Sequence, residues 1–305
     1  MYNKIVIIGC SNVGMAYAHN IVLRDSNVDE LALIDIQEEK MEGEAIDLNH
    51  TLAFTNNFIK IKKGDYSDCK DAVLCVICAG RNQKPNETRQ QLIDSNIAIM
   101  DSIITNCIKG GFNGIYVIAS NPVDILSLYA YKKLGGASCG KVIGSGTNLD
   151  TSRLCYIIGK KLSINPKYIN AFVLGEHGDS EMIAWDSASI ANNPISNFLT
   201  QKEMEEISFE VKNSAYEIIN KKGYTNYGIG SALFSITNAI LSNEDYILPV
   251  SNYDEKENVF YSRPCIIGRD GIKKVFNINL SKNDAKNLKA SIKYLQEIRD
   301  KCNIK

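Results

Sequence analysis

A strand-like run that leads directly into a glycine-containing turn constrains the fold more than any other feature. The run Lys4–Ile8 is apolar, and the turn Gly-Cys-Ser-Asn-Val-Gly and a helix-length segment follow it. A strand, a turn close to G-x-G-x-x-G and a helix are typical of a dinucleotide-binding fold, because backbone N–H groups and a helix N-terminus then face the pyrophosphate. We therefore expect a dinucleotide to contact Gly9, Ser11, Asn12, Val13 and Gly14.

Two residues refine this prediction. Ser11 stands where the pattern has its second glycine, so a Cβ must be fitted where the backbone approaches the phosphates most closely. Asp35 ends the apolar run LALID, about 20 residues beyond the turn, where its carboxylate can accept hydrogen bonds from the ribose hydroxyls. A carboxylate there repels a 2′-phosphate, so we expect NAD rather than NADP. The alternative is an aspartate that only caps the next helix.

Short β-rich runs alternate with helix-length periodic segments through the first half of the chain, which is the pattern of βαβ units. Strands are predicted at Lys4–Ile8, Glu30–Asp35, Phe58–Lys62, Ala72–Cys78, Gly114–Ala119 and Lys141–Ile143. Helices are predicted between them at Val13–Arg24, Glu38–Asn49, Arg89–Cys107 and Val123–Leu134. This order predicts an α/β fold with a doubly wound (Rossmann) parallel sheet, forming a dinucleotide-binding domain over residues 1–143.

The pattern changes after Gly144. Helices are predicted at Leu149–Leu162, Lys202–Lys221 and Gly230–Leu241, and a strand-like AFVLG lies between the first two. Three β-rich runs follow, and then a charged amphipathic helix over Lys282–Lys301. We predict a second, α+β domain over residues 144–305 that holds the substrate. It should pack tightly on the first domain, because no Pro/Ser-rich linker separates them.

Composition excludes several classes of protein. Of 305 residues, 45% are hydrophobic and 23% are charged, as in an average globular protein. The 34 Lys and Arg residues balance the 35 Asp and Glu residues, so no net field attracts nucleic acid or an anionic membrane. The apolar runs are strand-sized, and the N-terminus lacks a signal-peptide pattern. We expect a cytoplasmic protein without nucleic-acid or membrane partners.

Nine cysteines are an odd number in a long chain with no sign of secretion, so we expect reduced thiols. Cys75 and Cys78 form a C-x-x-C inside the strand-like run AVLCVICAG. Residues three apart in a strand face opposite sides of the sheet, so these sulfurs should share neither a metal nor a disulfide. We predict no metal site.

The chain contains only three histidines, so a histidine-dependent mechanism has few candidates. His177, in LGEHGDS, follows a strand-like run and precedes a glycine, so a loop can present its imidazole to a cleft. His19 is expected on the polar face of the first helix, and His50 at a helix end.

Several motifs occur together in one order. After GCSNVG come AGRNQKPNETR, SNPVDIL, GSGTNLDTSR, LGEHGDS and TNYGIG. Together they resemble the L-lactate/L-malate dehydrogenase family, its lactate branch most closely, over essentially the whole chain. The resemblance implies an NAD-dependent enzyme that interconverts pyruvate and L-lactate. The alternatives are another L-2-hydroxy acid dehydrogenase, acting on malate or a branched acid, and a non-catalytic nucleotide-binding derivative.

The resemblance also implies a role for each matching residue. His177 would exchange a proton with the pyruvate carbonyl oxygen, with Asp150 as its carboxylate partner. Arg153 would clamp the substrate carboxylate with its planar guanidinium, and Arg89 would support the negative charge that develops on the carbonyl oxygen. The remaining matches are Asn121 near the nicotinamide and substrate, Thr225 in the substrate pocket, and Ala79, Gly80 and Ile229 along the cofactor.

Gln83 is the residue expected to select the substrate. The malate branch has an arginine at this position, which pairs with the second carboxylate of oxaloacetate. A neutral amide leaves that carboxylate unpaired, and an unpaired buried charge costs several kcal/mol, so pyruvate is favoured. Arg81 and Lys84 lie nearby in the sequence and are expected to point to solvent. Either one would supply the missing charge if it reached the pocket.

Two departures from the family concern regulation. Bacterial lactate dehydrogenases that fructose 1,6-bisphosphate activates resemble one another in an arginine and a histidine at the positions of Cys155 and Asn170. Neither residue here supplies positive charge to a phosphate, so we expect little activation by the sugar bisphosphate. The resemblance implies a homotetramer.

Overall fold

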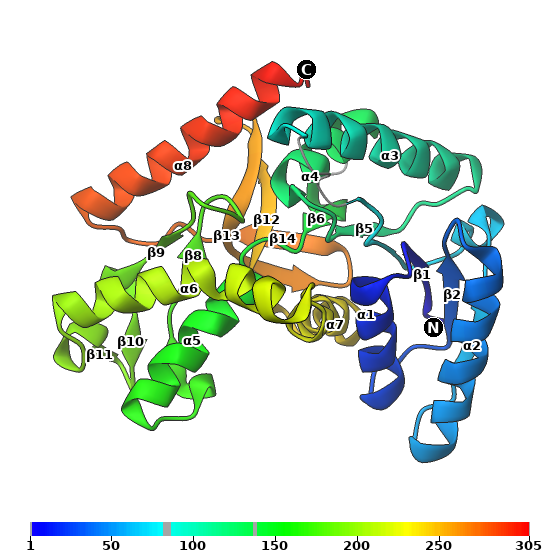
Figure 1. Ribbon diagram of the computed structural model, residues 1–305, viewed down its shortest axis with the longest axis horizontal. Helices are drawn as coiled ribbons and strands as arrows, with labels where there is room; N and C mark the ends of the chain where they lie inside the picture. Colours follow the sequence, from blue (N-terminus) through cyan, green and yellow to red (C-terminus); the bar gives the residue numbers. More distant parts are fainter. Residues whose placement is uncertain (1, 82–86, 137–138, 305) are drawn as a thin grey trace.

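The structure, a computed structural model, describes residues 2–81, 87–136 and 139–304. Gln83 and Lys84, which bear on the predicted substrate choice, lie outside the described residues. Helices surround one large sheet, which confirms the predicted α/β class (Figure 1). Within the described ranges, no helix is long and apolar enough to cross a membrane.

Six strands of the first half form the parallel part of the sheet, in the order β3-β2-β1-β4-β5-β6. The strands are β1 (Lys4–Ile8), β2 (Glu30–Ile34), β3 (Lys60–Lys63), β4 (Leu74–Ile77), β5 (Ile115–Ile118) and β6 (Val142–Gly144). The helices between them are α1 (Asn12–Leu23), α2 (Glu38–Thr51), α3 (Arg89–Lys109) and α4 (Val123–Lys133). This is the predicted doubly wound arrangement. Its strand order reverses between β1 and β4, where such sheets bind ligands at the carboxyl ends of their strands.

The sheet is buried on both faces, as the near-continuous apolar strands predict. Alternate residues of β1 enter different cores, Ile5 and Ile7 on one side and Val6 and Ile8 on the other. The first core packs against α1 and α2, and the second packs against α3 and α4. Because successive side chains of a strand point to opposite faces of the sheet, one apolar run contributes to both cores.

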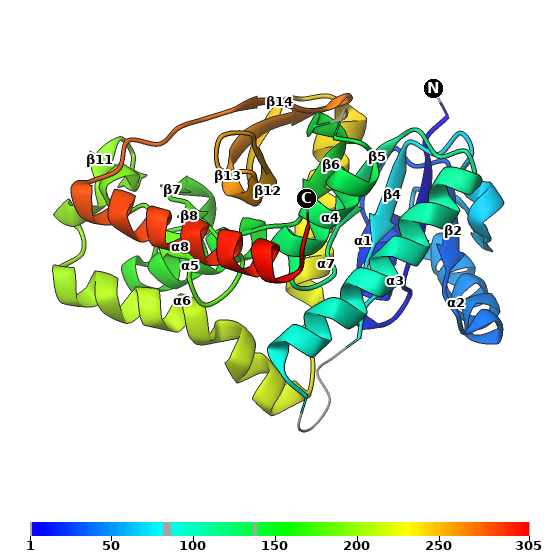
Figure 2. The ribbon, with the colours of Figure 1, turned by 90° about the horizontal axis from the view of Figure 1, so that it is seen from above.

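The second half extends this sheet instead of forming a separate one. Strands β12 (Tyr246–Asp254), β13 (Val259–Gly268) and β14 (Gly271–Val275) form an antiparallel meander beside β6 (Figure 2). The connection to β6 is antiparallel and pairs Ser251 with Gly144. The larger helices of this half are α5 (Asn148–Leu162), α6 (Gln201–Lys222), α7 (Tyr227–Ser242) and α8 (Lys282–Lys301).

Helices of the second half also cover the sheet of the first. Helix α7 packs along α1, and α8 runs back toward α4, so the C-terminal residues join the core on that face (Figure 1). A separate core lies between α5 and α6. Around it are the short strands β7 (Ile169–Asn170), β8 (Val173–Leu174), β9 (Met182–Ile183), β10 (Ser189–Ile190) and β11 (Asn193–Pro194).

Short 3₁₀ helices complete the described secondary structure. They are η1 (Leu52–Phe54), η2 (Tyr66–Cys69), η3 (Cys139–Lys141), η4 (Pro166–Tyr168), η5 (Trp185–Ser187) and η6 (Ile195–Asn197).

Most predicted bounds differ from the observed ones by only a few residues, and two differences have clear causes. The third strand begins at Lys60 instead of Phe58, whose side chain is fully exposed and finds no place in the sheet. Helix α7 begins at Tyr227, three residues before the predicted Gly230. Glycine disfavours helix formation locally, but the absence of a Cβ at Gly230 permits α7 to pack closely on the Ala16 backbone of α1.

Eight of the nine cysteines are described as free thiols: Cys10, Cys69, Cys75, Cys78, Cys107, Cys155, Cys265 and Cys302. Cys75 lies in β4, and Cys78 follows the end of that strand, so the C-x-x-C forms neither a disulfide nor a shared site. Instead, the Cys75 Sγ lies 3.8 Å from the Cys107 Sγ, and the Cys69 Sγ lies 4.0 Å from that same atom. All three side chains are fully buried in an apolar core, where they pack as small hydrophobic groups.

Candidate active site

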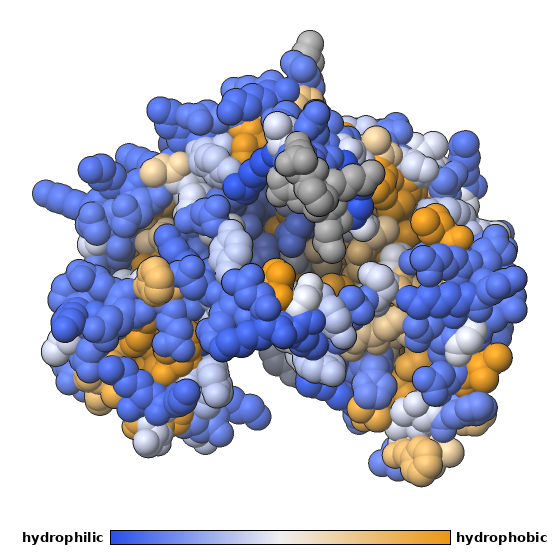
Figure 3. Space-filling view, in the orientation of Figure 1, coloured by the Kyte–Doolittle hydropathy of each residue, from blue (hydrophilic) through white to orange (hydrophobic). Residues whose placement is uncertain are grey.

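A cleft of about 400 Å³ opens between the two halves of the chain. Its walls come from α3, from the loops that follow β4, β5 and β8, and from α5 and α6. The surface is hollowed near its centre on the face shown in Figure 3. The predicted residues among those that line the cleft are Arg89, Asn121, Asp150, Arg153 and His177.

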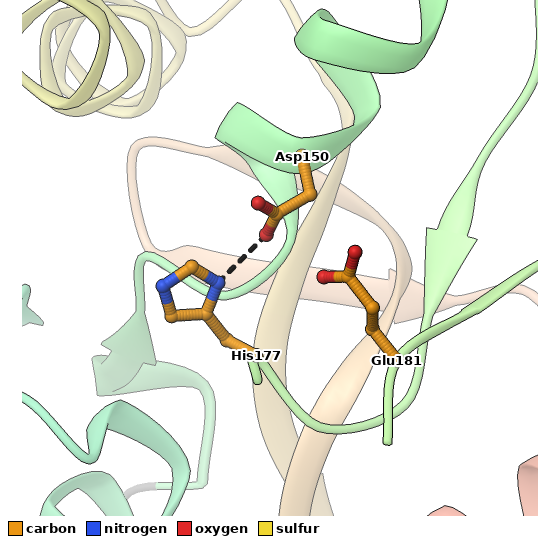
Figure 4. A group of neighbouring side chains, drawn as sticks. All are labelled: Asp150, His177 and Glu181. Atoms are coloured by element: carbon orange, nitrogen blue, oxygen red, sulfur yellow. Dashed lines mark hydrogen bonds and ion pairs between the residues drawn. The ribbon is translucent and has the colours of Figure 1, made fainter. Parts of the chain in front are cut away.

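Carboxylates hold both the backbone and the ring of His177. Its backbone N–H donates to Asp124 Oδ2 at 2.8 Å, and its Nδ1 lies 2.7 Å from Asp150 Oδ2. Asp150 lies in the first turn of α5, and His177 lies in the loop between β8 and β9 (Figure 4). Because Nδ1 faces the carboxylate, Nε2 points away from Asp150 and is the nitrogen left to exchange a proton.

The two side chains stabilise each other's charged forms. Burial opposes the ionised form of Asp150, but the positive charges of His177 and Arg153 outweigh it and lower the pKa of that carboxyl. Burial likewise opposes the imidazolium, but the charge and hydrogen bond of Asp150 raise the pKa of His177 to about 9. At neutral pH the pair is therefore a carboxylate and an imidazolium, which is a proton donor.

Arg153 lies one turn after Asp150 on the same face of α5. Its Nη1 donates to Asp150 Oδ1 at 2.6 Å, and its side chain is mostly buried. The two oxygens of Asp150 thus bind His177 and Arg153, which places a proton donor and a guanidinium side by side in the cleft.

Arg89 is the first residue of α3, where a capping box between Thr88 and Gln91 fixes the start of the helix. Its Nη2 lies 3.2 Å from Glu176 Oε1, and Glu176 is the buried residue that directly precedes His177. Arg89 is half-exposed at the rim of the cleft. The ion pair therefore connects the start of α3 to the loop that carries the imidazole.

Arg81 also lines the cleft, and its guanidinium is engaged by other side chains. Nη1 donates to Glu87 Oε2 at 2.7 Å, and Nη2 donates to the other Glu87 oxygen and to Ser95 Oγ at 2.6 Å. The backbone N–H of Arg81 donates to Asn96 Oδ1 at 3.1 Å. The Arg81 side chain is thus partly exposed in the cleft wall and paired with the Glu87 carboxylate, whereas the sequence predicted that it points to solvent.

Asn121 follows β5 and lines the cleft as predicted. Its backbone oxygen accepts a hydrogen bond from Asn96 Nδ2 at 2.9 Å, so Asn96 holds this loop and the loop after β4 together.

Sequence reasoning missed four buried polar residues of this region: Asn96, Asp124, Glu176 and Glu181. Three of them, Asp124, Glu176 and Glu181, lie within or directly beside the motifs SNPVDIL and LGEHGDS. Their place in these motifs was the one sequence feature that could have identified them.

The turn after β1 provides a cradle that fits a dinucleotide. A Cβ on Gly9, which has φ +92°, would lie 2.2 Å from the Ala79 backbone nitrogen, and a Cβ on Gly14 would lie 2.2 Å from the Gly9 oxygen. Only glycine permits this close approach of backbone segments. Helix α1 has no acidic residue in its first turn and no side-chain cap, so its N-terminal N–H groups suit an anion such as a pyrophosphate.

Ser11 and Asp35 both fit this cradle. Ser11 has φ −91°, an ordinary conformation in which its Cβ causes no backbone strain, and it is exposed. Asp35 is half-buried directly after β2, and its Oδ2 accepts a hydrogen bond from the Cys10 N–H at 2.8 Å. This bond fixes the carboxylate beside the turn.

Two residues predicted for the site lie away from the cleft, and a third is outside the described residues. Thr225 lies half-buried between α6 and α7, and Ile229 lies in α7 and packs against the core of the sheet. Neither lines the cleft. Gln83 is outside the described residues.

Within the described part of the chain, one group of side chains has the composition of a metal site. The ligand atoms of Asp150, His177 and Glu181 lie within 4.8 Å of one another. However, Asp150 already binds the His177 ring and Arg153, whose guanidinium would repel a cation. We assign no metal here.

Comparisons with known proteins agree over nearly the whole chain. Residues 3–144 match the family model of the lactate/malate dehydrogenase NAD-binding domain, and residues 147–303 match that of its alpha/beta C-terminal domain. The L-lactate dehydrogenase of Halalkalibacterium halodurans is 44% identical over 97% of this chain and 96% of its own length. That of Borrelia hermsii is 40% identical over 98% of each chain.

Solved structures give the same result. A lactate dehydrogenase from a Medee basin deep-sea metagenome library superposes with a TM-score of 0.96 at 42% identity, over 99% of this chain and 100% of that one. The minor L-lactate dehydrogenase of Enterococcus mundtii, in a ligand-bound form, gives 0.95 at 36% identity over 98% of both chains. The chain therefore belongs to the lactate/malate dehydrogenase family.

Proposed function

We propose that the protein is an NAD-dependent L-lactate dehydrogenase that interconverts pyruvate and L-lactate. The observation that carries the proposal is the continuous contact of His177, Asp150 and Arg153 in the cleft, with distances of 2.7 Å and 2.6 Å. These are the groups that reduction of a 2-oxo acid requires: a proton donor, a carboxylate that keeps it charged, and a guanidinium that binds the substrate carboxylate. Relatives named L-lactate dehydrogenase support the assignment.

We assign the cofactor to the turn after β1, where Gly9, Ser11, Asn12, Val13 and Gly14 would hold the pyrophosphate and Asp35 the ribose. NADH, when bound, supplies the hydride. Arg153 binds the pyruvate carboxylate, and the imidazolium of His177 gives its Nε2 proton to the carbonyl oxygen. Asp150 stabilises the imidazolium before this transfer and fixes the ring's orientation throughout. In lactate oxidation the neutral imidazole takes the proton back.

Other predicted residues take supporting roles in the proposal. Arg89 and Asn121 line the cleft, where they can stabilise charge on the substrate oxygen and orient the substrate. Ala79 and Gly80 follow β4 at the switch point of the sheet. The backbone of Ala79 lies so close to Gly9 that a Cβ on Gly9 would collide with it. Thr225 and Ile229 remain assigned to the pocket and the cofactor by the family resemblance alone.

Pyruvate is the proposed substrate rather than oxaloacetate. Gln83 supplies no charge for a second carboxylate, and the nearby guanidinium of Arg81 is paired with Glu87. A dicarboxylate would have to break that ion pair in order to use it, at a cost that a methyl group avoids.

The proposal also covers activation by a sugar bisphosphate, the oligomeric state and the location in the cell. Cys155 is half-buried in α5 and Asn170 is exposed in β7, and neither carries positive charge for a sugar bisphosphate. We therefore infer activity without fructose 1,6-bisphosphate. The family resemblance favours a homotetramer and a cytoplasmic location.

One assay tests the function. Purified protein is given NADH with pyruvate or oxaloacetate, each with and without fructose 1,6-bisphosphate, and NADH oxidation is followed. The proposal expects preference for pyruvate without need of the activator. Preference for oxaloacetate would indicate a malate enzyme, and absence of turnover with either acid would indicate a non-catalytic derivative. A strong drop in the KM for pyruvate on adding the activator would contradict the argument from Cys155 and Asn170.

A further inference from the structure

Glu181 is a buried carboxyl beside the catalytic pair that the mechanism above does not use. It lies at the end of the loop that carries His177, directly before β9, and its backbone N–H donates to the Gly178 oxygen at 3.1 Å. Only 6% of the residue is exposed. Its carboxyl faces the Asp150–His177 pair (Figure 4).

The surroundings of Glu181 differ from those of Asp150. Asp150 has an imidazole and a guanidinium in direct contact, whereas no described residue forms a hydrogen bond or an ion pair with the Glu181 carboxyl. Glu181 also forms part of the wall between the catalytic cleft and a second cavity of about 550 Å³. A buried carboxylate without a hydrogen bond or an ion pair regains only part of the hydration that it loses, which favours its neutral form.

The charged and titratable groups around Glu181 act in opposite directions. Asp150 disfavours its ionisation, while His177, Lys212 and Arg153 favour it. Across the second cavity lie Glu205 from α6 and Asp284 and Tyr294 from α8. Burial and then Asp150 dominate, and they raise the pKa of Glu181 to about 8. Two neighbouring carboxyls are thus driven to opposite protonation states, as in sites where two carboxyls have different tasks.

We propose that Glu181 is a positioning residue that is protonated when the substrate carboxylate binds, and that its ionisation sets the upper pH limit of substrate binding. This inference rests on the proposed function. With Glu181 neutral, Asp150, His177 and Arg153 together carry a net positive charge that matches the single negative charge of a monocarboxylate. Ionised Glu181 cancels this charge, so the substrate carboxylate loses its electrostatic attraction to the cleft.

The test is the pH dependence of inhibitor binding by the enzyme–NADH complex. Oxamate, the amide isostere of pyruvate, is titrated by calorimetry at pH values from about 7 to about 9, so that binding is read without turnover. The pKa values of about 8 for Glu181 and about 9 for His177 predict a dissociation constant about 20-fold higher at the upper pH in the natural protein. Glu181→Gln, which is permanently neutral, should show only the smaller rise that comes from deprotonation of His177.

Two further variants sharpen the test. Glu205→Gln removes a carboxyl that lines the second cavity but not the cleft, and it should behave as the natural protein does. Lys212→Gln removes an exposed ammonium that favours ionised Glu181, so the rise in the dissociation constant should begin at higher pH. Because Lys212 is on the surface, this variant decides the question even if Glu181→Gln does not fold.

Each outcome has a distinct meaning. A Glu181→Gln profile parallel to that of the natural protein overturns the proposal, and so does loss of oxamate binding at pH 7 in that variant. If Glu181→Gln does not fold, an unshifted Lys212→Gln profile overturns it equally. If the natural protein neither binds oxamate nor reduces pyruvate at any pH, the proposed function itself has failed. Pyruvate reduction with the predicted difference between the profiles supports both.

Discussion

At the scale of single residues, Asp150 determines when His177 can act as an acid. Pyruvate reduction needs the imidazolium, so kcat at saturating pyruvate should persist up to about pH 9 and fall above it, while lactate oxidation should rise through the same range. The value of kcat/KM for pyruvate should already fall from about pH 8, because ionised Glu181 weakens substrate binding. Asp150→Asn removes the negative charge, so the pKa of His177 falls. Both limbs should then move to lower pH, and kcat/KM for pyruvate should fall by about a hundredfold. Initial rates in both directions against pH measure this, and unchanged limbs would contradict it.

A second prediction concerns the pair formed by Arg81 and Glu87. Glu87→Gln removes a carboxylate that pairs with Arg81, so a second substrate carboxylate no longer has to displace this ion pair in order to approach the guanidinium in the cleft wall. The ratio of kcat/KM for oxaloacetate to that for pyruvate should rise by about tenfold, because a charge-assisted bond contributes about 1.5–3 kcal/mol. Steady-state kinetics with both acids measure the ratio. In the double variant Arg81→Ala/Glu87→Gln the gain should vanish, and a gain that survives there would show another cause.

Sequence motifs predicted the central residues but not the other buried polar groups around them. His177, Asp150 and Arg153 were identified because motif order restricts their chemistry, and the structure places them in contact. Asp124 and Glu181 were missed because a carboxyl in a motif does not reveal which way it faces. Likewise, the internal partner of Arg81 depends on how α3 begins, which residue type alone cannot show.

At the scale of elements, the packing of α7 on α1 depends on Gly230. A Cβ there would lie 2.8 Å from the Ala16 carbonyl carbon and 2.9 Å from its oxygen, both of which are backbone atoms that cannot move aside cheaply. Gly230→Ala should therefore reduce the free energy of unfolding by about 1–3 kcal/mol. Denaturant titration measures the change, with the slope compared between variants.

Gly43 provides the matched control, because it also lies inside a helix, α2, but nothing is within 4 Å of the position of its Cβ. Gly43→Ala should increase the free energy of unfolding by about 0.5–1 kcal/mol. Equal effects of the two alanines would show that helix propensity, and not the contact with α1, governs Gly230.

Element types were predictable where local signals agree. The capping box at Thr88 marks the start of α3, and the continuous apolar run of β1 marks a strand buried on both faces. The start of α7 was not predictable, because its glycines oppose helix formation locally and only tertiary contacts explain them: Gly230 lies against α1, and Gly228 lies against Leu149 of α5. Tertiary packing overrides propensity at such positions.

At the scale of the whole molecule, the two halves share one sheet and its cores. Strands β12–β14 continue the parallel sheet through β6, and residues of α7 and α8 pack into cores formed mainly by the first half. The sequence predicted two domains, but it could not predict this continuity. Pairing between β6 and β12 joins segments about a hundred residues apart, and no local pattern specifies it.

This shared sheet predicts that the chain unfolds as a single unit. Trp185 is the chain's only tryptophan and lies in the second half, where its indole N–H donates to Ser208 Oγ at 3.1 Å. Its fluorescence therefore reports on the second half, whereas far-ultraviolet circular dichroism reports on all helices. The two thermal transitions should coincide. NAD⁺ at about a hundred times its dissociation constant should raise both midpoints equally, by about 5 °C, although the cradle lies in the first half. A fluorescence midpoint that does not respond to NAD⁺ would show that the halves unfold independently, and that the continuous sheet does not couple them.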